Sequence, residues 1–197
     1  MLSEYIMYTN CMYHHYKGNQ LPRSDAIQKL VVERILANPL TDDQRENSKV
    51  WELKHSSSCI QIGRLLAIKR GLNVELAETI CALHDIYAID TGHYDEHAQK
   101  GAEIAKGLLI ATGQFSEQEI NIICDAIRAH SDKQIYSDSL YSEMIKDADI
   151  FDCSLYEGTK KYYEKHKPID VRREYYHRIQ KVREELGLPP DIQFTVK

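Results

Sequence analysis

Four of the nine histidines fall on apolar faces of helical patterns, where an imidazole must find a buried partner. His55, for example, shares a face with Cys59, Ile62 and Leu66 at helical spacing. Three further segments each place one histidine in the same way: His84, His97 and His130. One inward histidine usually bonds to a backbone carbonyl. Four of them from four segments favour a shared partner, a metal ion that several imidazoles bind together.

Two aspartates extend this candidate metal site. Asp149 follows Ile145 by four residues and so lies on the same inward helical face, and Asp85 directly follows His84. Mixed imidazole and carboxylate ligands suit one or two divalent ions, Fe, Mn, Co or Ni, with Mg²⁺ a further option if one hard site is filled. The alternative is a set of separate core histidines, each with its own hydrogen bond.

The segments that must position these side chains are expected to be helical, which makes the fold class all-α. Asn73 and Ser116 are typical N-caps, and Thr41 to Gln44 reads as a capping box for the helix after it. A polar loop is expected over 89–96. The predicted helices cover about 24–37, a stretch ending at Gly71, 74–85, 97–112, 116–130, 138–165 with a break near Gly158, and 170–186.

Composition predicts a single globular domain over 1–197. Hydrophobic residues make up 43% and charged residues 28%, and 197 residues can bury an adequate core without a disulfide or metal staple. The net charge of −5 argues against binding to long nucleic acids. Five cysteines without a CxxC pair indicate neither a disulfide framework nor a zinc knuckle. Without a signal-peptide pattern or an apolar run of about 20 residues, the expected location is the cytoplasm, with no membrane partner.

The order of these motifs resembles the HD superfamily of metal-dependent phosphohydrolases. The matching pieces are His55 on a helix, ALHDIY with His84 and Asp85, and KDADIFD with Asp149. HAQKGA from His97 and DAIRAH up to His130 also match. The resemblance covers about 50–157 and implies a compact multi-helix HD-domain-like bundle there. It says nothing about 1–40 or the C-terminal helix, which we expect to be helical extensions of this core. The chain is also loosely similar to the bacterial symmetrical dinucleoside-tetraphosphate hydrolases.

The resemblance assigns the metal ligands residue by residue. It implies a first ion held by His55, His84, Asp85 and Asp149, and a second held by Asp85 as a bridge together with the remaining two histidines, His97 and His130. Asp147 is the rival of Asp149, because it lies two residues away and about 200° around the helix. Some relatives carry two consecutive histidines where this chain has His130 and Ser131, which leaves the tightness of the second site open.

The resemblance further implies hydrolysis of a phosphate ester or anhydride, such as that of a nucleotide or other small molecule, by a metal-activated water. Asp85 would orient this water, and no separate protein nucleophile is apparent. Lys133 is the preferred phosphate-binding and catalytic cation, and Lys54, Arg128 and Lys146 are the alternatives. For each of the four, an exposed surface charge is the commoner case. Tyr87 and Tyr94 could stack on a base, although surface or packing tyrosines are commoner, and His93 could contact the substrate.

Two other functions stay open on this sequence. One is a non-catalytic metal- or nucleotide-binding module, and the other is a di-iron oxygenase on the same fold, because four histidines and two aspartates suit either chemistry. A homo-oligomer is a further option that the sequence does not decide.

Overall fold

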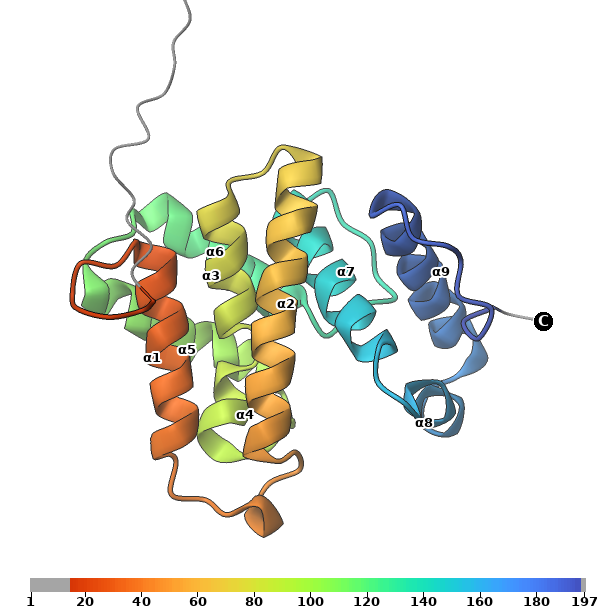
Figure 1. Ribbon diagram of the computed structural model, residues 1–197, viewed down its shortest axis with the longest axis horizontal. Coiled ribbons are helices and arrows are strands. Elements are labelled where there is room, and N and C mark those ends of the chain that lie inside the picture. The colour runs from red at the N-terminus through yellow and green to blue at the C-terminus, as the bar shows by residue number, and fades with distance from the viewer. Residues whose placement is uncertain (1–14, 196–197) are drawn as a thin grey trace, which may run out of the picture.

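The computed structural model describes residues 15–195, so His14 and Cys11 lie outside the described part. Within it the chain is helical and contains no strand, which confirms the all-α prediction (Figure 1). The elements are α1 (Arg23–Ala37), the 3₁₀ turn η1 (Asp42–Gln44), α2 (Lys49–Arg70), α3 (Val74–Leu83), α4 (Ile86–Thr91), α5 (His97–Thr112), α6 (Glu117–Ala129), α7 (Leu140–Ser154), α8 (Thr159–His166) and α9 (Ile169–Glu185).

Two of the predicted N-caps are confirmed. The Asn73 side chain accepts a hydrogen bond from the backbone of α3, and Ser116 with Glu119 forms the capping box of α6. The capping box at Thr41 to Gln44 is present, but it begins only the short turn η1. The prediction that it starts the long helix was wrong, because Ser48 caps α2 instead.

The predicted start of the loop over 89–96 was also wrong. The chain continues as α4 to Thr91, and Gly92 ends the helix with a left-handed φ of 79°. A Cβ at Gly92 would lie 3.2 Å from the Cα of Arg45, so the close approach of these two segments also favours glycine there. The break near Gly158 is confirmed, because this residue separates α7 from α8 with a φ of 87°.

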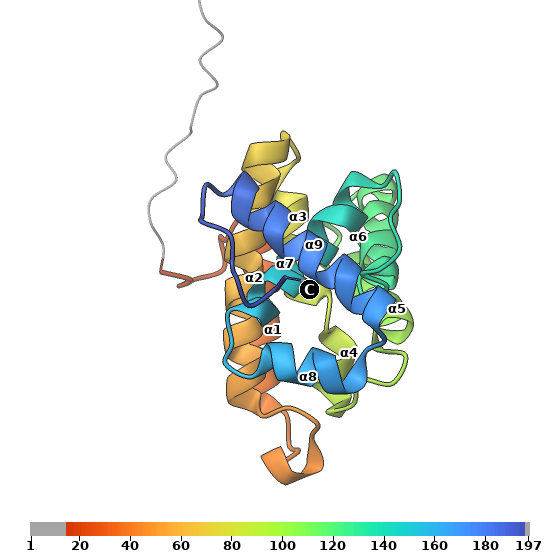
Figure 2. The same cartoon turned by 90° about the vertical axis from the view of Figure 1, so that its right-hand side faces the viewer.

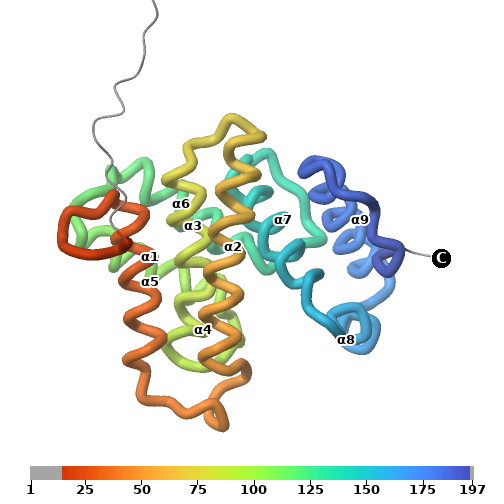
Figure 3. Tube along the Cα trace, viewed as in Figure 1, coloured from red at the N-terminus to blue at the C-terminus, as the bar shows by residue number. Residues whose placement is uncertain are grey.

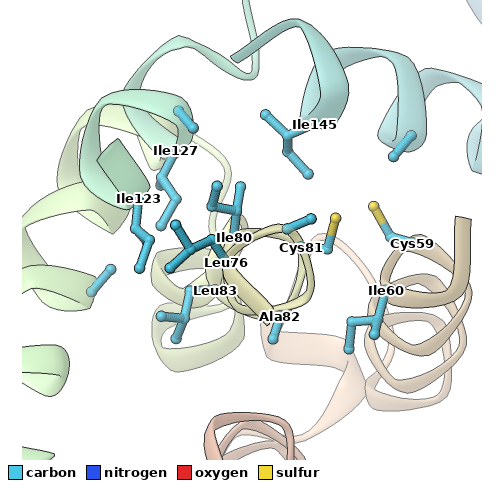
Figure 4. Packing of buried hydrophobic residues seen from close by; sticks show 14 of the residues in the cluster. Cys59, Ile60, Leu76, Ile80, Cys81, Ala82, Leu83, Ile123, Ile127 and Ile145 are labelled. Carbon is cyan, nitrogen blue, oxygen red and sulfur yellow. The ribbon is translucent and has the colours of Figure 1, made fainter. Parts of the chain in front are cut away.

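The main core surrounds α3. Figure 4 shows its side chains, including Ile80 and Leu83, between Ile123 and Ile127 of α6 on one side and α2 on the other. Removing these groups from water is the dominant favourable contribution to folding. The three cysteines predicted to be reduced core residues are buried and free: Cys59, Cys81 and Cys124.

The C-terminal helices have a second, smaller core. It consists of Ile150 of α7 with Tyr163, Tyr175, Tyr176, Ile179 and Phe194. Figures 2 and 3 show α8 and α9 at the end of the molecule opposite α1, with α7 connecting them to the main bundle. Three tyrosines therefore serve packing in this part of the molecule. No helix among the described residues has the length and apolar character needed to span a bilayer.

Candidate metal centre

The four inward histidines come together in one cluster. His55 lies on α2 and His84 at the end of α3, and their Nε2 atoms are 3.2 Å apart. His97 begins α5 and His130 ends α6, and their Nε2 atoms are 3.1 Å apart. His55, His84 and His130 are buried. Four helix segments therefore direct imidazole nitrogens to two adjacent points.

Asp85 lies between these two imidazole pairs. Its Oδ2 is 3.7 Å from Nε2 of His55 and 3.3 Å from Nε2 of His84. Its Oδ1 is 3.5 Å from Nε2 of His97 and 3.3 Å from Nε2 of His130. Although Oδ1 is buried, it accepts no hydrogen bond, which is uncommon for a buried carboxylate oxygen. One oxygen facing each pair is the arrangement that a carboxylate bridging two cations requires.

The other ring nitrogens determine what these histidines present to the cluster. Nδ1 of His84 donates to the backbone carbonyl of Cys81 at 2.8 Å, and Nδ1 of His97 and of His130 likewise bond to the carbonyl three residues earlier. A carbonyl can only accept, so Nδ1 carries the proton and a neutral ring presents the lone pair of Nε2. Such backbone bonds are typical of metal-binding histidines.

His55 is oriented by a carboxylate that the sequence analysis missed. Asp152, buried on α7, accepts from Nδ1 of His55 at 2.5 Å and also accepts a short hydrogen bond from the Ser58 hydroxyl. The available signal was its position three residues after Asp149, on the same helical face. Asp152 therefore belongs to the shell around the candidate ligands.

We expect Asp152→Asn to weaken metal binding about 10- to 100-fold, because loss of the carboxylate removes the charge that orients His55 and raises its basicity. Competition with a chelator would measure the affinity. Asp125→Asn, at an exposed position of α6, is the matched control and should leave affinity unchanged. An unchanged affinity in Asp152→Asn would contradict the assigned role.

Asp149 joins the cluster together with Lys133. Asp149 Oδ1 lies 3.6 Å from Nε2 of His55, and its Oδ2 lies 2.6 Å from the ammonium of Lys133. Burial by itself lowers the pKa of Lys133, but the adjacent Asp149 carboxylate raises it above its ordinary value, so the ammonium remains charged. The structure thus places a charged lysine beside the candidate metal ligands.

Asp147, the rival of Asp149, faces elsewhere. It is fully buried, and its Oδ1 is 2.7 Å from Nη1 of Arg178. Its Oδ2 is 2.8 Å from Nη2 of Arg70 and 3.0 Å from Nζ of Lys181. Both oxygens are thus held by cations of α2 and α9, which leaves Asp149 as the α7 carboxylate within the cluster.

Asp85 and His130 have the charge states that suit metal ligands, whereas the raised pKa of His84 favours its protonated ring. Burial raises the pKa of Asp85, but His84 and His130 together lower it well below its ordinary value. Burial lowers the pKa of His130 to about 4, so this ring is neutral at pH 7. Burial also lowers the pKa of His84, but Asp85 outweighs this and leaves it raised. Ionised carboxylate and neutral imidazole are the forms that bind metals.

The donor separations also fit metal coordination. Two donors bound at right angles to one ion, each at about 2.1 Å, lie about 3.0 Å apart. The separations of the donors in the structure run from 3.1 Å to 3.7 Å, close to that value. The groups His55–His84–Asp85 and Asp85–His97–His130 each converge closely enough to hold one ion. The residues present therefore fit one or two divalent metal ions.

Two predicted substrate contacts, His93 and Tyr87, lie apart from this cluster. The His93 ring is exposed, with Nδ1 3.6 Å from Glu46, and Tyr87 contacts Lys100. The described contacts bring neither side chain to the metal ligands. The tyrosine that does reach them is Tyr94, whose hydroxyl lies 3.5 Å from Asp85 Oδ2.

The three alternatives to Lys133 as the phosphate-binding cation lie away from the metal ligands. Lys54 is exposed and lies over the Tyr156 ring, and Arg128 pairs with Asp125 on the surface. The interpretation of Lys146 as a surface charge was wrong, because its ammonium is buried beside Glu143 and bonds to a carbonyl. Among these candidate cations, the described contacts bring Lys133 alone to the cluster.

Comparisons with known proteins agree with this geometry. A family model described as the HD domain matches residues 53–153, a range that includes every candidate metal ligand. A solved structure described as a predicted HD superfamily hydrolase, from an uncultured Thermotogales bacterium, superposes with a TM-score of 0.53 and 22% sequence identity. The match covers 85% of this chain and 91% of the other, which shows a shared fold. A search of curated proteins finds no match. By fold, by motif order and by the family match, this chain belongs to the HD domain family.

Proposed function

We propose that this protein is a metal-dependent phosphohydrolase that cleaves a phosphate ester or anhydride of a small molecule, with nucleotides as the first class to test. The observation that carries the proposal is the position of Asp85, which offers one oxygen to each of two imidazole pairs. The buried ammonium of Lys133 beside the same cluster supports it, because a phosphoryl group needs a cationic neighbour.

Each group of the site has a role in this reaction. The bound ions would lower the pKa of a water and neutralise the charge on phosphoryl oxygens. Asp85 holds the two halves of the site together and orients the water. The Lys133 ammonium donates one hydrogen bond to Asp149 and has two further N–H groups that can donate to a phosphoryl oxygen.

A cysteine nucleophile is disfavoured by the same structure. Cys153 lies nearest, with its thiol 3.5 Å from Asp149 Oδ1. Burial raises the pKa of this thiol well above its ordinary value, and the Asp149 carboxylate raises it further. A thiol in that state is a weak nucleophile, so attack by water is favoured.

The test combines metal analysis with a phosphate-release screen. The screen covers nucleoside mono-, di- and triphosphates, dinucleoside polyphosphates and cyclic nucleotides, each with protein reconstituted with Mn²⁺, Fe²⁺, Co²⁺ or Ni²⁺. We expect one or two ions per chain and an activity that a chelator abolishes and added metal restores. A reconstituted protein that binds no metal would contradict the site, and a metal-loaded protein without activity would favour a binding module.

We expect Lys133→Met to lower kcat/KM by about 10- to 100-fold, because a hydrogen bond to a charged phosphoryl oxygen contributes about 1.5–3 kcal/mol. The metal content should persist, because Lys133 is not a candidate ligand. Lys106→Met, at an exposed position of α5, is the matched control. Equal activity of the two variants would remove Lys133 from the substrate site.

The six candidate metal ligands also support a second function, that of a di-iron oxygenase. Four imidazoles and two carboxylates around two adjacent points also suit iron pairs that react with dioxygen. Oxygen consumption by the iron-loaded protein would support this candidate. Phosphate release that is equal in anaerobic and aerobic buffer would support the phosphohydrolase.

A further inference from the structure

The loop over 130–139 joins α6 to α7 and carries Lys133. The Lys133 ammonium has a defined place, 2.6 Å from Asp149 Oδ2, although its backbone belongs to a connecting segment. Two backbone carbonyls of the loop, those of Lys133 and Ile135, accept hydrogen bonds from side chains of other elements. Because the backbone groups of a loop need such partners, the side chains that bond to these carbonyls decide where Lys133 lies.

Arg178, on the C-terminal helix α9, is a partner of both carbonyls. Its Nε donates to the carbonyl of Lys133 at 2.5 Å, and its Nη2 donates to the carbonyl of Ile135 at 3.2 Å. Lys146 of α7 adds a second bond to the Ile135 carbonyl, at 2.8 Å. The Arg178 side chain has no exposed surface. A rigid, planar guanidinium therefore holds the backbone of the loop at two points.

The same guanidinium is also attached to α7, the helix that carries Asp149. Its Nη1 donates to Asp147 Oδ1 at 2.7 Å, and its Nη2 lies 2.7 Å from Glu143 Oε2. The Tyr136 ring of the loop lies over it, with the ring centroid 4.2 Å from the guanidinium carbon. Because α9 packs beside α7 (Figure 1), Arg178 connects three segments: the loop, α7 and α9.

These contacts form a closed ring around Lys133. Arg178 holds the backbone carbonyl of Lys133, and Asp147 holds Arg178. Asp149, two residues further along α7, holds the ammonium of Lys133. Hydrogen bonds from a charged guanidinium are strong and directional. Removing Arg178 would release the loop at its backbone while leaving the ammonium and its carboxylate chemically unchanged.

We propose that Arg178 is a positioning residue, which fixes the loop on α7 so that the Lys133 ammonium stays beside Asp149. This inference rests on the proposed phosphohydrolase function, in which Lys133 binds the phosphoryl group. Arg178 lies outside 53–153, the range that matches the HD domain. The C-terminal helix α9 therefore acts on the site through the loop that carries Lys133.

A double-mutant cycle separates positioning from general stabilisation. Arg178→Lys keeps a positive charge for Asp147, but one ammonium cannot occupy the places of all three guanidinium nitrogens. The substrate is the nucleotide that the phosphate-release screen cleaves fastest. At a low temperature, where circular dichroism shows the metal-loaded variants to be folded, we expect Arg178→Lys to lower kcat/KM about 5- to 50-fold. In the Lys133→Met background the same change should lower it less than about twofold.

The matched control is Arg173→Lys, which makes the same chemical change at an exposed position of α9. It should leave kcat/KM unchanged in both backgrounds. An equal loss from Arg178→Lys in both backgrounds would show that Arg178 acts on the whole fold and not through Lys133, which would overturn the proposal.

A nuclear magnetic resonance signal gives a readout that does not depend on activity. With ¹⁵N-labelled lysine, the Lys133 ammonium should exchange slowly with solvent, because it bonds to a buried carboxylate, and its signal should be missing from Lys133→Met. Arg178→Lys should broaden or remove this signal, and Arg173→Lys should retain it. An unaltered ammonium signal in Arg178→Lys would overturn the positioning role.

One measurement needs only the wild-type protein, so it decides the matter even if Arg178→Lys does not fold. The Nε–H of Arg178 should exchange with solvent at least about 100-fold more slowly than that of Arg173, because it is buried on the Lys133 carbonyl. Equal exchange rates would contradict the attachment of the loop.

Failure of the proposed function would have a different signature. Metal-loaded wild-type protein would then release no phosphate from any substrate of the screen. The two exchange measurements would still show whether Arg178 holds Lys133 in place.

Discussion

Asp85→Asn is expected to lose the bound metal and to lower phosphohydrolase activity at least about a thousandfold. The amide retains one oxygen, so one imidazole pair would face an NH₂ group that cannot bind a cation. The site also loses the negative charge that would neutralise part of the charge of bound divalent ions. Metal analysis after reconstitution and phosphate release by the same sample would measure both effects.

Asp125→Asn is the matched control, because it makes the same chemical change on the surface of α6. It should retain both metal and activity. Circular dichroism should show that Asp85→Asn remains helical, since its side chain bonds to no helix backbone in this fold. A variant with full metal content and full activity would refute the bridging role of Asp85.

Asp147→Asn is expected to lower the free energy of unfolding by about 3–5 kcal/mol, because it weakens the partner of a buried guanidinium. Arg178 has no exposed surface and is 2.7 Å from Asp147, and Arg70 is also within 3 Å of the same carboxylate. For a chain of this length, the melting temperature should fall by about 6–20 °C. Urea unfolding and thermal scans of the metal-free protein would measure both quantities.

The comparison with Asp149→Asn separates stability from metal binding. At low temperature, where both variants are folded, Asp147→Asn should bind metal normally. Asp149→Asn should bind it weakly, because its Oδ1 faces the imidazole of His55. Equal metal loss in the two variants would contradict the assignment of separate roles to these neighbouring carboxylates.

Much of the fold followed from local signals in the sequence. Asn73, Ser116 and Gly158 marked helix ends correctly, because caps and left-handed glycines act within a few residues. Thr41 did not, because a capping box forms equally well on a short turn. A second local cap, Ser48, whose side chain accepts from the Trp51 backbone, begins α2 instead.

The sequence determined the inward faces from which His55, His84, His97, His130 and Asp149 project, since helical periodicity fixes the direction of each side chain relative to its own helix. Periodicity carries no information on how one helix is placed against another. Only the tertiary structure decided that these faces meet at Asp85, that Lys133 rather than Lys146 lies beside them, and that Tyr94 rather than Tyr87 adjoins the cluster. These contacts join residues of different segments, and the packing of α2, α3, α6 and α7 around the core sets them.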